Sequence, residues 1–179
     1  MSTYQKADES VAELANEIMC AHESHKPLLD AKIKIDYLFA YPPEDADGMP
    51  TGPALKRHGC KALGITRKIT LRDRAKGNGD AEISIDYGWW NDASPEQRRA
   101  LLDHELTHIE IAENDDGSIK TDDLSRPILR LRPHDYEFGW FASIAQRHGE
   151  SSQERIQAAQ MMEDSGQLLW PDILKSEAA

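Results

Sequence analysis

Apolar residues recur with helical spacing in some parts of the chain and alternate with polar residues in others. Near the start, Val11, Leu14 and Ile18 lie three and four residues apart, which predicts an amphipathic helix over residues 8–23. Alternating segments rich in Ile, Tyr and Phe predict strands instead. We place these strands at residues 32–41, within residues 61–71, and at residues 81–87.

The clearest helix signal begins at Ser94. Ser94 can accept hydrogen bonds from the first turn, Pro95 suits the first helical position, and Gln97 completes a capping box. We expect this helix to run through His108 and to end near Asn114, where a turn sequence begins. Beyond it, the pattern predicts a hairpin over residues 118–132 with 128–132 as its second arm, a helix from Pro133 to Gly149, and a helix over residues 151–164.

The resulting order of elements indicates an α+β fold in which a small mixed or antiparallel sheet packs beside several helices. The chain has 179 residues, of which 39% are hydrophobic and 30% are charged. This length and this balance are typical of one globular domain with a substantial core. Since no repeat or linker divides the sequence, we expect residues 1–179 to form a single domain.

The charge of the chain limits its partners. The formal net charge is −11, whereas nucleic-acid binding depends on Lys and Arg that neutralise phosphates, so a nucleic-acid partner is disfavoured. No run of about 18 apolar residues is present to span a membrane, and the first residues lack the apolar stretch of a secretory signal. Two cysteines, Cys20 and Cys60, are too few for a disulfide framework. We therefore expect a cytoplasmic protein.

The candidate chemistry is concentrated in the sequence His104-Glu105-Leu106-Thr107-His108. Residues four apart on a helix lie on the same face, so the imidazoles of His104 and His108 project toward one point. This spacing suits two of the ligands of a tetrahedral zinc ion. The motif falls within a helix that is predicted independently from its capping residues. The sequence therefore predicts that His104 and His108 bind Zn²⁺.

Glu105 follows the first of these histidines and is displaced around the helix, so it does not complete the metal site by default. It can still reach a water on the zinc. Zinc lowers the pKa of such a water toward about 7, and a carboxylate can take the proton as the water attacks a carbonyl carbon. We expect Glu105 to be the general base of a hydrolytic reaction.

A catalytic zinc usually has three protein ligands and one open position, so the motif needs a third ligand. Glu110 and Glu113 lie on or near the end of the same helix and cannot easily turn back to the metal. His134 begins the next helix after a hairpin that returns the chain, so it can approach the motif from the side. We select His134 as the third ligand and keep Asp135 and Glu137 as alternatives.

Several further segments match one known family, in order along the chain: Gly52–Lys56 with His58-Gly59, Leu71–Gly77, Asp80–Ile83, Leu102–His108, Arg126-Pro127 with His134-Asp135, and Arg147–Gly149. In these segments the sequence resembles the phage metallopeptidases, a zincin-like group found in bacteriophages and prophages. The resemblance covers the region from residue 30 to residue 160, and Asp103–His108 is its most specific part.

This resemblance implies a zincin-like fold and the catalytic roles of His104, Glu105 and His108. In such enzymes a strand at the edge of the cleft binds an extended peptide by main-chain pairing, and we assign that role to residues 81–87. The resemblance also supports the zinc cofactor but adds little about the substrate. Our leading hypothesis is a zinc peptidase that acts on a protein or peptide in the cytoplasm of a bacterial host.

A second hypothesis keeps the zinc fold without the reaction. A strongly acidic surface can occupy a basic site, so the chain could be a non-catalytic acidic protein that binds a host protein or mimics nucleic acid. The two hypotheses differ at Glu105, because only the peptidase needs its carboxylate.

Overall fold

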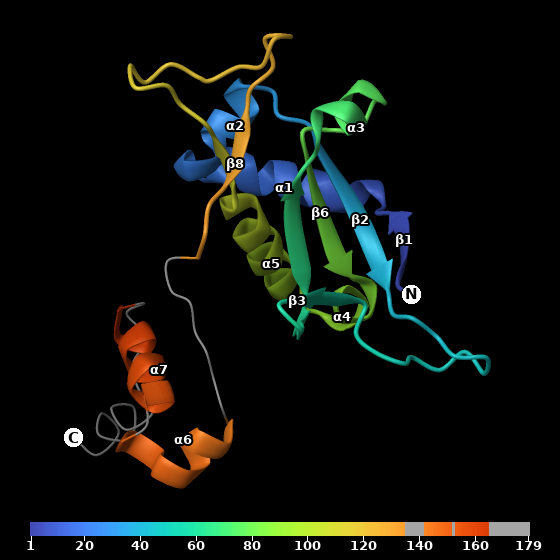
Figure 1. Cartoon of the computed structure of the whole chain (residues 1–179), viewed down its shortest axis with the longest axis vertical. Helices are drawn as coiled ribbons and strands as arrows, with labels where there is room; N and C mark the ends of the chain where they lie inside the picture. Colours follow the sequence, from blue (N-terminus) through green and yellow to red (C-terminus); the bar gives the residue numbers. More distant parts are fainter. Residues whose placement is uncertain (135–141, 152, 165–179) are drawn as a thin grey trace. The chain divides into compact units, whose positions relative to one another are not determined.

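The fold is described from a computed structural model of the chain, over residues 1–134, 142–151 and 153–164. It is a mixed α+β structure with small sheets (Figure 1), as the sequence predicts.

The chain divides into two compact units, Met1–Pro133 and His134–Ala179, and the expectation of a single domain stays a prediction. The elements of the first unit are β1 (Thr3–Lys6), α1 (Glu9–Ala21), η1 (Glu23–His25), α2 (Lys26–Asp30), β2 (Ile35–Tyr41), β3 (Leu55–Arg57), β4 (Cys60–Ala62), β5 (Gly64–Lys68), α3 (Leu71–Ala75), β6 (Ala81–Asp86), α4 (Tyr87–Asp92), α5 (Pro95–Thr107), β7 (Ile109–Ile111) and β8 (Leu129–Leu131).

The central sheet of the first unit has four strands in the order β1-β2-β6-β5. Strands β2 and β6 are parallel, whereas β1 pairs with β2 and β5 pairs with β6 in antiparallel register. Strand β6 therefore has a neighbour on each side. Strand β5 forms one edge of this sheet, with β6 as its single neighbour there.

This strand order corrects the assignment of the peptide-binding strand. The sequence analysis gives that role to residues 81–87, but β6 is hydrogen-bonded to β2 on one side and to β5 on the other. Its backbone groups are already used, and all six of its residues are buried. A strand that pairs with a substrate needs an open edge, and in this region of the sheet that edge belongs to β5.

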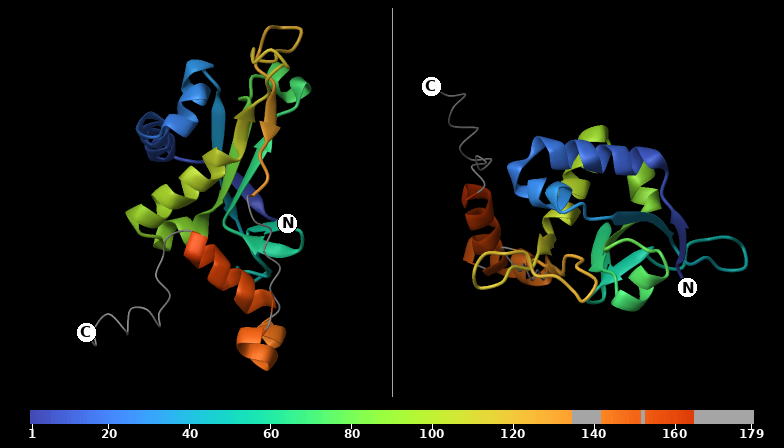
Figure 2. Two further views of the ribbon diagram at one scale, coloured as in Figure 1. Left: turned by 90° about the vertical axis from the view of Figure 1, so that its left-hand side faces the viewer. Right: turned by 90° about the horizontal axis from the view of Figure 1, so that it is seen from above.

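Helices α1 and α5 cover one face of the sheet, as the two views in Figure 2 show. The main core lies between these helices and β6. Because Leu102 and Leu106 are one helical turn apart and both fully buried, they fix which side of α5 faces the core. The largest fully buried side chains come from all three elements: Val11, Ile18, Ile83, Ile85, Leu102 and Leu106.

The opposite face of the sheet is polar near β6. Glu82, Ser84 and Asp86 alternate with the core residues of the same strand and are nevertheless buried. The hairpin of β3 and β4 lies on this side, where Leu55 packs with Ala40 of β2 in a second, smaller cluster. The sheet thus separates an apolar helix-covered side from a polar side.

The end of the motif helix differs from the prediction. Helix α5 ends at Thr107 instead of continuing to Asn114, and β7 follows it directly. The hairpin predicted over residues 118–132 is confirmed in part, since Thr121 pairs with Pro127 and the Ile128 N–H donates to the Lys120 carbonyl oxygen at 2.9 Å. Its second arm continues as β8, which pairs with β7. The β-branched residues of β7 alternate with Glu110, a pattern that favours a strand once a pairing partner is present.

The second unit contains α6 (Ala142–His148), η2 (Gly149–Ser151) and α7 (Gln153–Asp164). Helix α7 confirms the helix predicted over residues 151–164. The helix predicted from Pro133 to Gly149 is described over α6 alone, since residues 135–141 lie outside the described residues. Among the residues described, no helix has the length and apolar character needed to cross a bilayer.

Candidate metal centre

Helix α5 carries His104 and Glu105 and is capped at its end by His108. Local hydrogen bonds fix the start of the helix. Ser94 Oγ accepts a hydrogen bond from the Gln97 backbone N–H at 3.3 Å, while the Ser94 N–H donates to the Gln97 side chain at 2.8 Å. This reciprocal capping box is the one that the sequence predicts. Further along, the Asp103 carboxylate lies 2.7 Å from His25 Nε2, a contact that ties α5 to η1.

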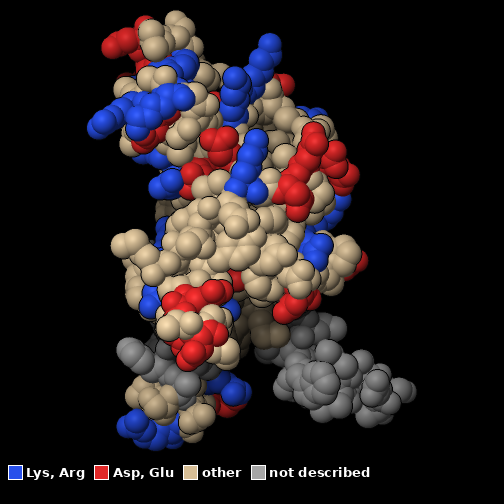
Figure 3. All heavy atoms as spheres, turned by 90° about the vertical axis from the view of Figure 1, so that its right-hand side faces the viewer, with Lys and Arg blue, Asp and Glu red and all other residues tan. Residues whose placement is uncertain are grey.

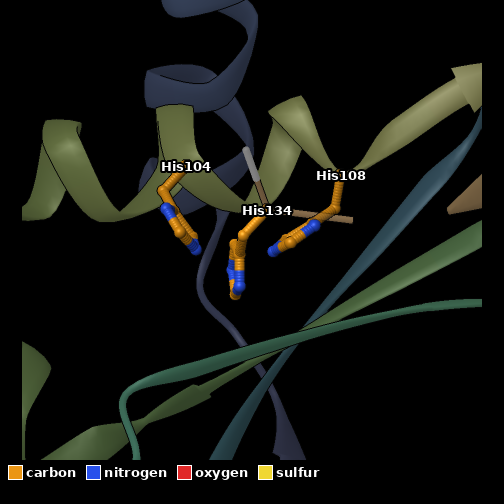
Figure 4. Close-up of side chains that lie close together, drawn as sticks. All are labelled: His104, His108 and His134. Carbon is orange, nitrogen blue, oxygen red and sulfur yellow. The ribbon is translucent and has the colours of Figure 1, made fainter. Parts of the chain in front are cut away.

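Three histidines lie close together at the end of this helix. His104 and His108 project from consecutive turns of α5, with ring centroids 5.0 Å apart and ring planes at 87°. One ring nitrogen from each of His104, His108 and His134 lies within 4.8 Å of the other two. Figure 4 shows the three rings on the same side of α5. The structure thus brings together the three residues that the sequence analysis selects as ligands.

The path of the chain explains how His134 reaches the helix. Strands β7 and β8 are antiparallel, with Ile109 opposite Leu131. The pairing continues past the strands, because the Arg132 N–H donates to the His108 carbonyl oxygen at 2.8 Å. His134 follows two residues later, so the register of this ladder returns the third histidine to the end of α5.

A backbone carbonyl orients the ring of His108. Nδ1 of His108 lies 2.7 Å from the carbonyl oxygen of Arg132, which can only accept a hydrogen bond. The ring nitrogen Nδ1 therefore donates, and the lone pair for metal binding is on Nε2. His108 is buried, whereas His104 and His134 are exposed. The buried ring is thus held in the tautomer and orientation that a metal ligand requires.

The chemistry of this donor set fits a divalent transition metal. Three imidazole nitrogens are a common donor set for catalytic zinc, with a fourth position left for water or substrate. His104, His108 and His134 are the residues that would hold the ion. Within the described parts of the chain, they are the one group of three His, Cys, Asp or Glu residues placed closely enough to do so.

Glu105 directly follows His104 in the sequence, and its side chain points toward strand β5 of the sheet. Its side chain is buried, with 3% of the residue exposed. The hydroxyl of Thr66, on β5, lies 2.6 Å from Glu105 Oε2 and 3.0 Å from the Glu105 backbone oxygen. Sequence analysis did not single out Thr66, because a lone threonine in a short strand carries no signal of a contact with a helix that comes much later.

The other candidates for the third ligand are placed differently. Glu110 lies on β7 instead of α5, and its carboxylate forms an ion pair with Arg130 across the β7–β8 ladder at 2.7 Å. Asp135 and Glu137 lie outside the described residues. Of the ligands considered from the sequence, His134 is the one that the described structure brings to the two helix histidines.

Comparisons with known proteins point to a single family. A family profile described as "Putative phage metallopeptidase" matches residues 3–165, which is nearly the whole chain. The comparisons with curated proteins and with solved structures gave no match. The family match includes all the residues of the metal centre described above, as well as β5 and Thr66.

Proposed function

We propose that this chain, which belongs to the phage metallopeptidase family, is a zinc-dependent peptidase of a zincin-like fold. The grouping of His104, His108 and His134, with the buried Glu105 directly after His104 in the sequence of α5, is the observation that carries this proposal. Three imidazoles offer a site for one metal ion, and the carboxylate offers a base next to it.

The reaction follows from the groups around this site. His104, His108 and His134 would hold the zinc, which would supply Lewis acidity and lower the pKa of a water. Glu105 would take a proton from the attacking water as the water oxygen adds to the carbonyl carbon of the substrate. The same carboxyl group then passes the proton to the leaving nitrogen as the C–N bond breaks. The chain thereby supplies both proton transfers of peptide hydrolysis from one side chain.

The position of the edge strand suggests how a substrate binds. Strand β5 is an edge strand of the described four-stranded sheet, and its residue Thr66 contacts Glu105 directly. An extended peptide that pairs with the backbone of β5 would pass beside the base. The proposed substrate is accordingly a protein or peptide in an extended conformation. We propose that its cleavage takes place in the cytoplasm of a bacterial host.

The distribution of charge bears on the alternative of an acidic protein that mimics nucleic acid. Such mimicry needs a continuous acidic surface. On the face shown in Figure 3, Lys and Arg side chains lie among the Asp and Glu side chains. Where residues are described, that face offers no continuous acidic surface. Mimicry also gives no reason for three grouped histidines or for a buried Glu105 in the same motif. The peptidase is therefore the better-supported function.

The test compares wild-type protein with Glu105→Gln, both loaded with zinc. We expect both to bind one zinc ion per chain and only the wild type to cleave a mixture of fluorescence-quenched peptides efficiently. The variant should lose about 10²–10⁴-fold in kcat/KM, the usual contribution of a positioned base. Equal cleavage by both proteins, or a zinc-loaded wild type that cleaves no peptide, would contradict the proposed function.

A further inference from the structure

The side chain of Thr66 is unusually placed for a residue of an edge strand. Thr66 is 5% exposed, and its hydroxyl contacts both the carboxylate and the backbone oxygen of Glu105. The hydroxyl must be the donor, because a carboxylate and a carbonyl oxygen only accept. With one proton to give, the closer partner at 2.6 Å, Oε2 of Glu105, is favoured.

Gly64 lies two residues before Thr66 and therefore faces the same side of β5. A Cβ atom at this glycine would lie 2.7 Å from Cδ and 2.8 Å from Cγ of Glu105, and closer still to Oε1. Real Cβ atoms are not found at such distances from carbon atoms. The space above Gly64 is therefore occupied by the Glu105 side chain, and any larger residue would displace it.

We propose that Thr66 and Gly64 together position the general base Glu105. The Thr66 hydroxyl holds one carboxylate oxygen, and Gly64 leaves the space in which the rest of the carboxylate lies. This inference rests on the proposed function, in which Glu105 handles the proton of the attacking water. The inference adds a second role for β5. The strand that pairs with the substrate in the proposed function would also hold Glu105, so β5 would set the distance between the base and the substrate.

The first test replaces Thr66 with Val and with Ser. Valine keeps the shape of threonine and removes the hydroxyl, so kcat should fall about 10–100-fold while KM changes less than about twofold. Serine keeps the hydroxyl and should restore kcat to within a few fold of wild type. Equal losses in Thr66→Val and Thr66→Ser, or no loss in Thr66→Val, would overturn the positioning role.

Ser84 provides a matched control on the neighbouring strand. Its hydroxyl is also buried and also bonds a glutamate, Glu82, at 3.2 Å, but on the opposite face of the sheet. Replacing Ser84 with Ala therefore removes a comparable buried hydrogen bond without touching Glu105. We expect Ser84→Ala to leave kcat unchanged. A loss in Ser84→Ala as large as that in Thr66→Val would mean that the effect comes from general damage to the sheet.

The second test replaces Gly64 with Ala and uses Gly79 as its control. At Gly79 an added Cβ would lie 2.6 Å from the Lys34 backbone oxygen, which cannot rotate away. Gly79→Ala should therefore lower the melting temperature with little change in kcat. In Gly64→Ala the atoms in the way belong to the Glu105 side chain, so kcat should fall at least about tenfold and zinc binding should persist. Unchanged kcat in Gly64→Ala would contradict the inference.

A structural measurement separates failure of this inference from failure of the proposed function. Crystal structures of the metal-free Thr66→Val, Thr66→Ser and wild-type chains report the position of the Glu105 carboxylate without any reaction. We expect the carboxylate to move in Thr66→Val and to keep its place in Thr66→Ser. A carboxylate that stays in place in Thr66→Val overturns the inference, even if the wild type is active. A wild type without peptidase activity overturns the proposed function, whatever the crystals show.

Discussion

Glu105 and Glu82 are both buried, with 3% and 8% of each residue exposed, but they lie on opposite faces of the central sheet. The Glu82 carboxylate is held by the Arg67 guanidinium in a two-point contact, with nitrogen–oxygen distances of 2.7 and 2.8 Å. The Glu105 carboxylate is held by the hydroxyl of Thr66 at 2.6 Å. Among the described residues, no ion pair involves Glu105.

The comparison shows that burial alone does not identify a reactive acid. An arginine that binds a carboxylate at two points occupies both of its oxygens and compensates its charge. The hydrogen bond that Arg67 donates to Glu82 is also the main reason why the pKa of Arg67 lies above its usual value. A carboxylate held by one hydroxyl can accept a proton without first giving up an ion pair. These surroundings suit Glu82 to a structural role in the sheet and Glu105 to the proposed role of general base.

The largest expected effect comes from replacing each glutamate with glutamine. Glu105→Gln should lower kcat/KM by about 10²–10⁴-fold and leave the melting temperature within about 2 °C of wild type. Glu82→Gln should keep kcat/KM within about twofold of wild type and lower the melting temperature by several degrees, since it weakens the contact with Arg67. Peptide cleavage and thermal unfolding of the two variants check this. The opposite pattern would remove the distinction between the two acids.

A smaller effect, on the free energy of unfolding, is expected from replacing Arg67 on the polar face of the sheet. Arg67→Met leaves the buried Glu82 carboxylate without its cation, so the free energy of unfolding should fall. The loss should be about 1–2 kcal/mol, below the value for a fully buried pair, because the Arg67 side chain is 63% exposed and water screens the interaction. Urea unfolding measures it. Catalysis by Arg67→Met should match wild type, and a large loss of kcat would connect the polar face to the reaction.

A change at the start of α5 tests which element holds Glu105 in place. Ser94→Ala removes the capping hydrogen bond and should cost about 1 kcal/mol of stability. If β5 positions Glu105, this change at the far end of the helix should leave kcat unaltered. Chemical unfolding and steady-state kinetics on the same preparation give both numbers. A drop in kcat comparable to that of Thr66→Val would show that the helix start positions the base as well.

The smallest effect is expected at Asp73, an exposed counterpart of the two buried acids. A hydrogen bond from Lys76, and then one from Thr70, hold the pKa of the Asp73 carboxyl below its usual value. A lowered pKa in the folded state means that the charged form stabilises the fold above about pH 4 and that this contribution is lost as the pH falls further. The stability of Asp73→Asn should therefore approach that of wild type in acid, as pH-dependent unfolding would show. A difference that grows below pH 4 would contradict this sign.

The local parts of the site were accessible from the sequence. The capping box depends on Ser94 and Gln97, three residues apart, and the metal motif on His104 and His108, one turn apart. Contacts of this range are set by helix geometry, so the residue pattern alone predicts them. The mixed α+β fold followed in the same way from the order of periodic and alternating segments.

The non-local parts could not be derived in this way. The register between β7 and β8, which brings His134 to the helix, depends on pairing between segments far apart in sequence. The contact between Thr66 and Glu105 spans 39 residues. The interior position of β6 depends on which strands flank it. Its sequence alternates polar and apolar residues, as the sequence of an edge strand can also do, so the alternation does not show that β6 is interior. Local patterns carry no information on such choices.

The central claim is that His104, His108 and His134 bind one zinc ion, and X-ray absorption at the zinc edge tests it most directly. Purified protein, supplied with one equivalent of zinc and washed, should retain one ion per chain. The spectrum should show three imidazole nitrogens at about 2.0–2.1 Å and one further light atom. A preparation that retains no zinc, or a spectrum without imidazole ligands, would contradict the account.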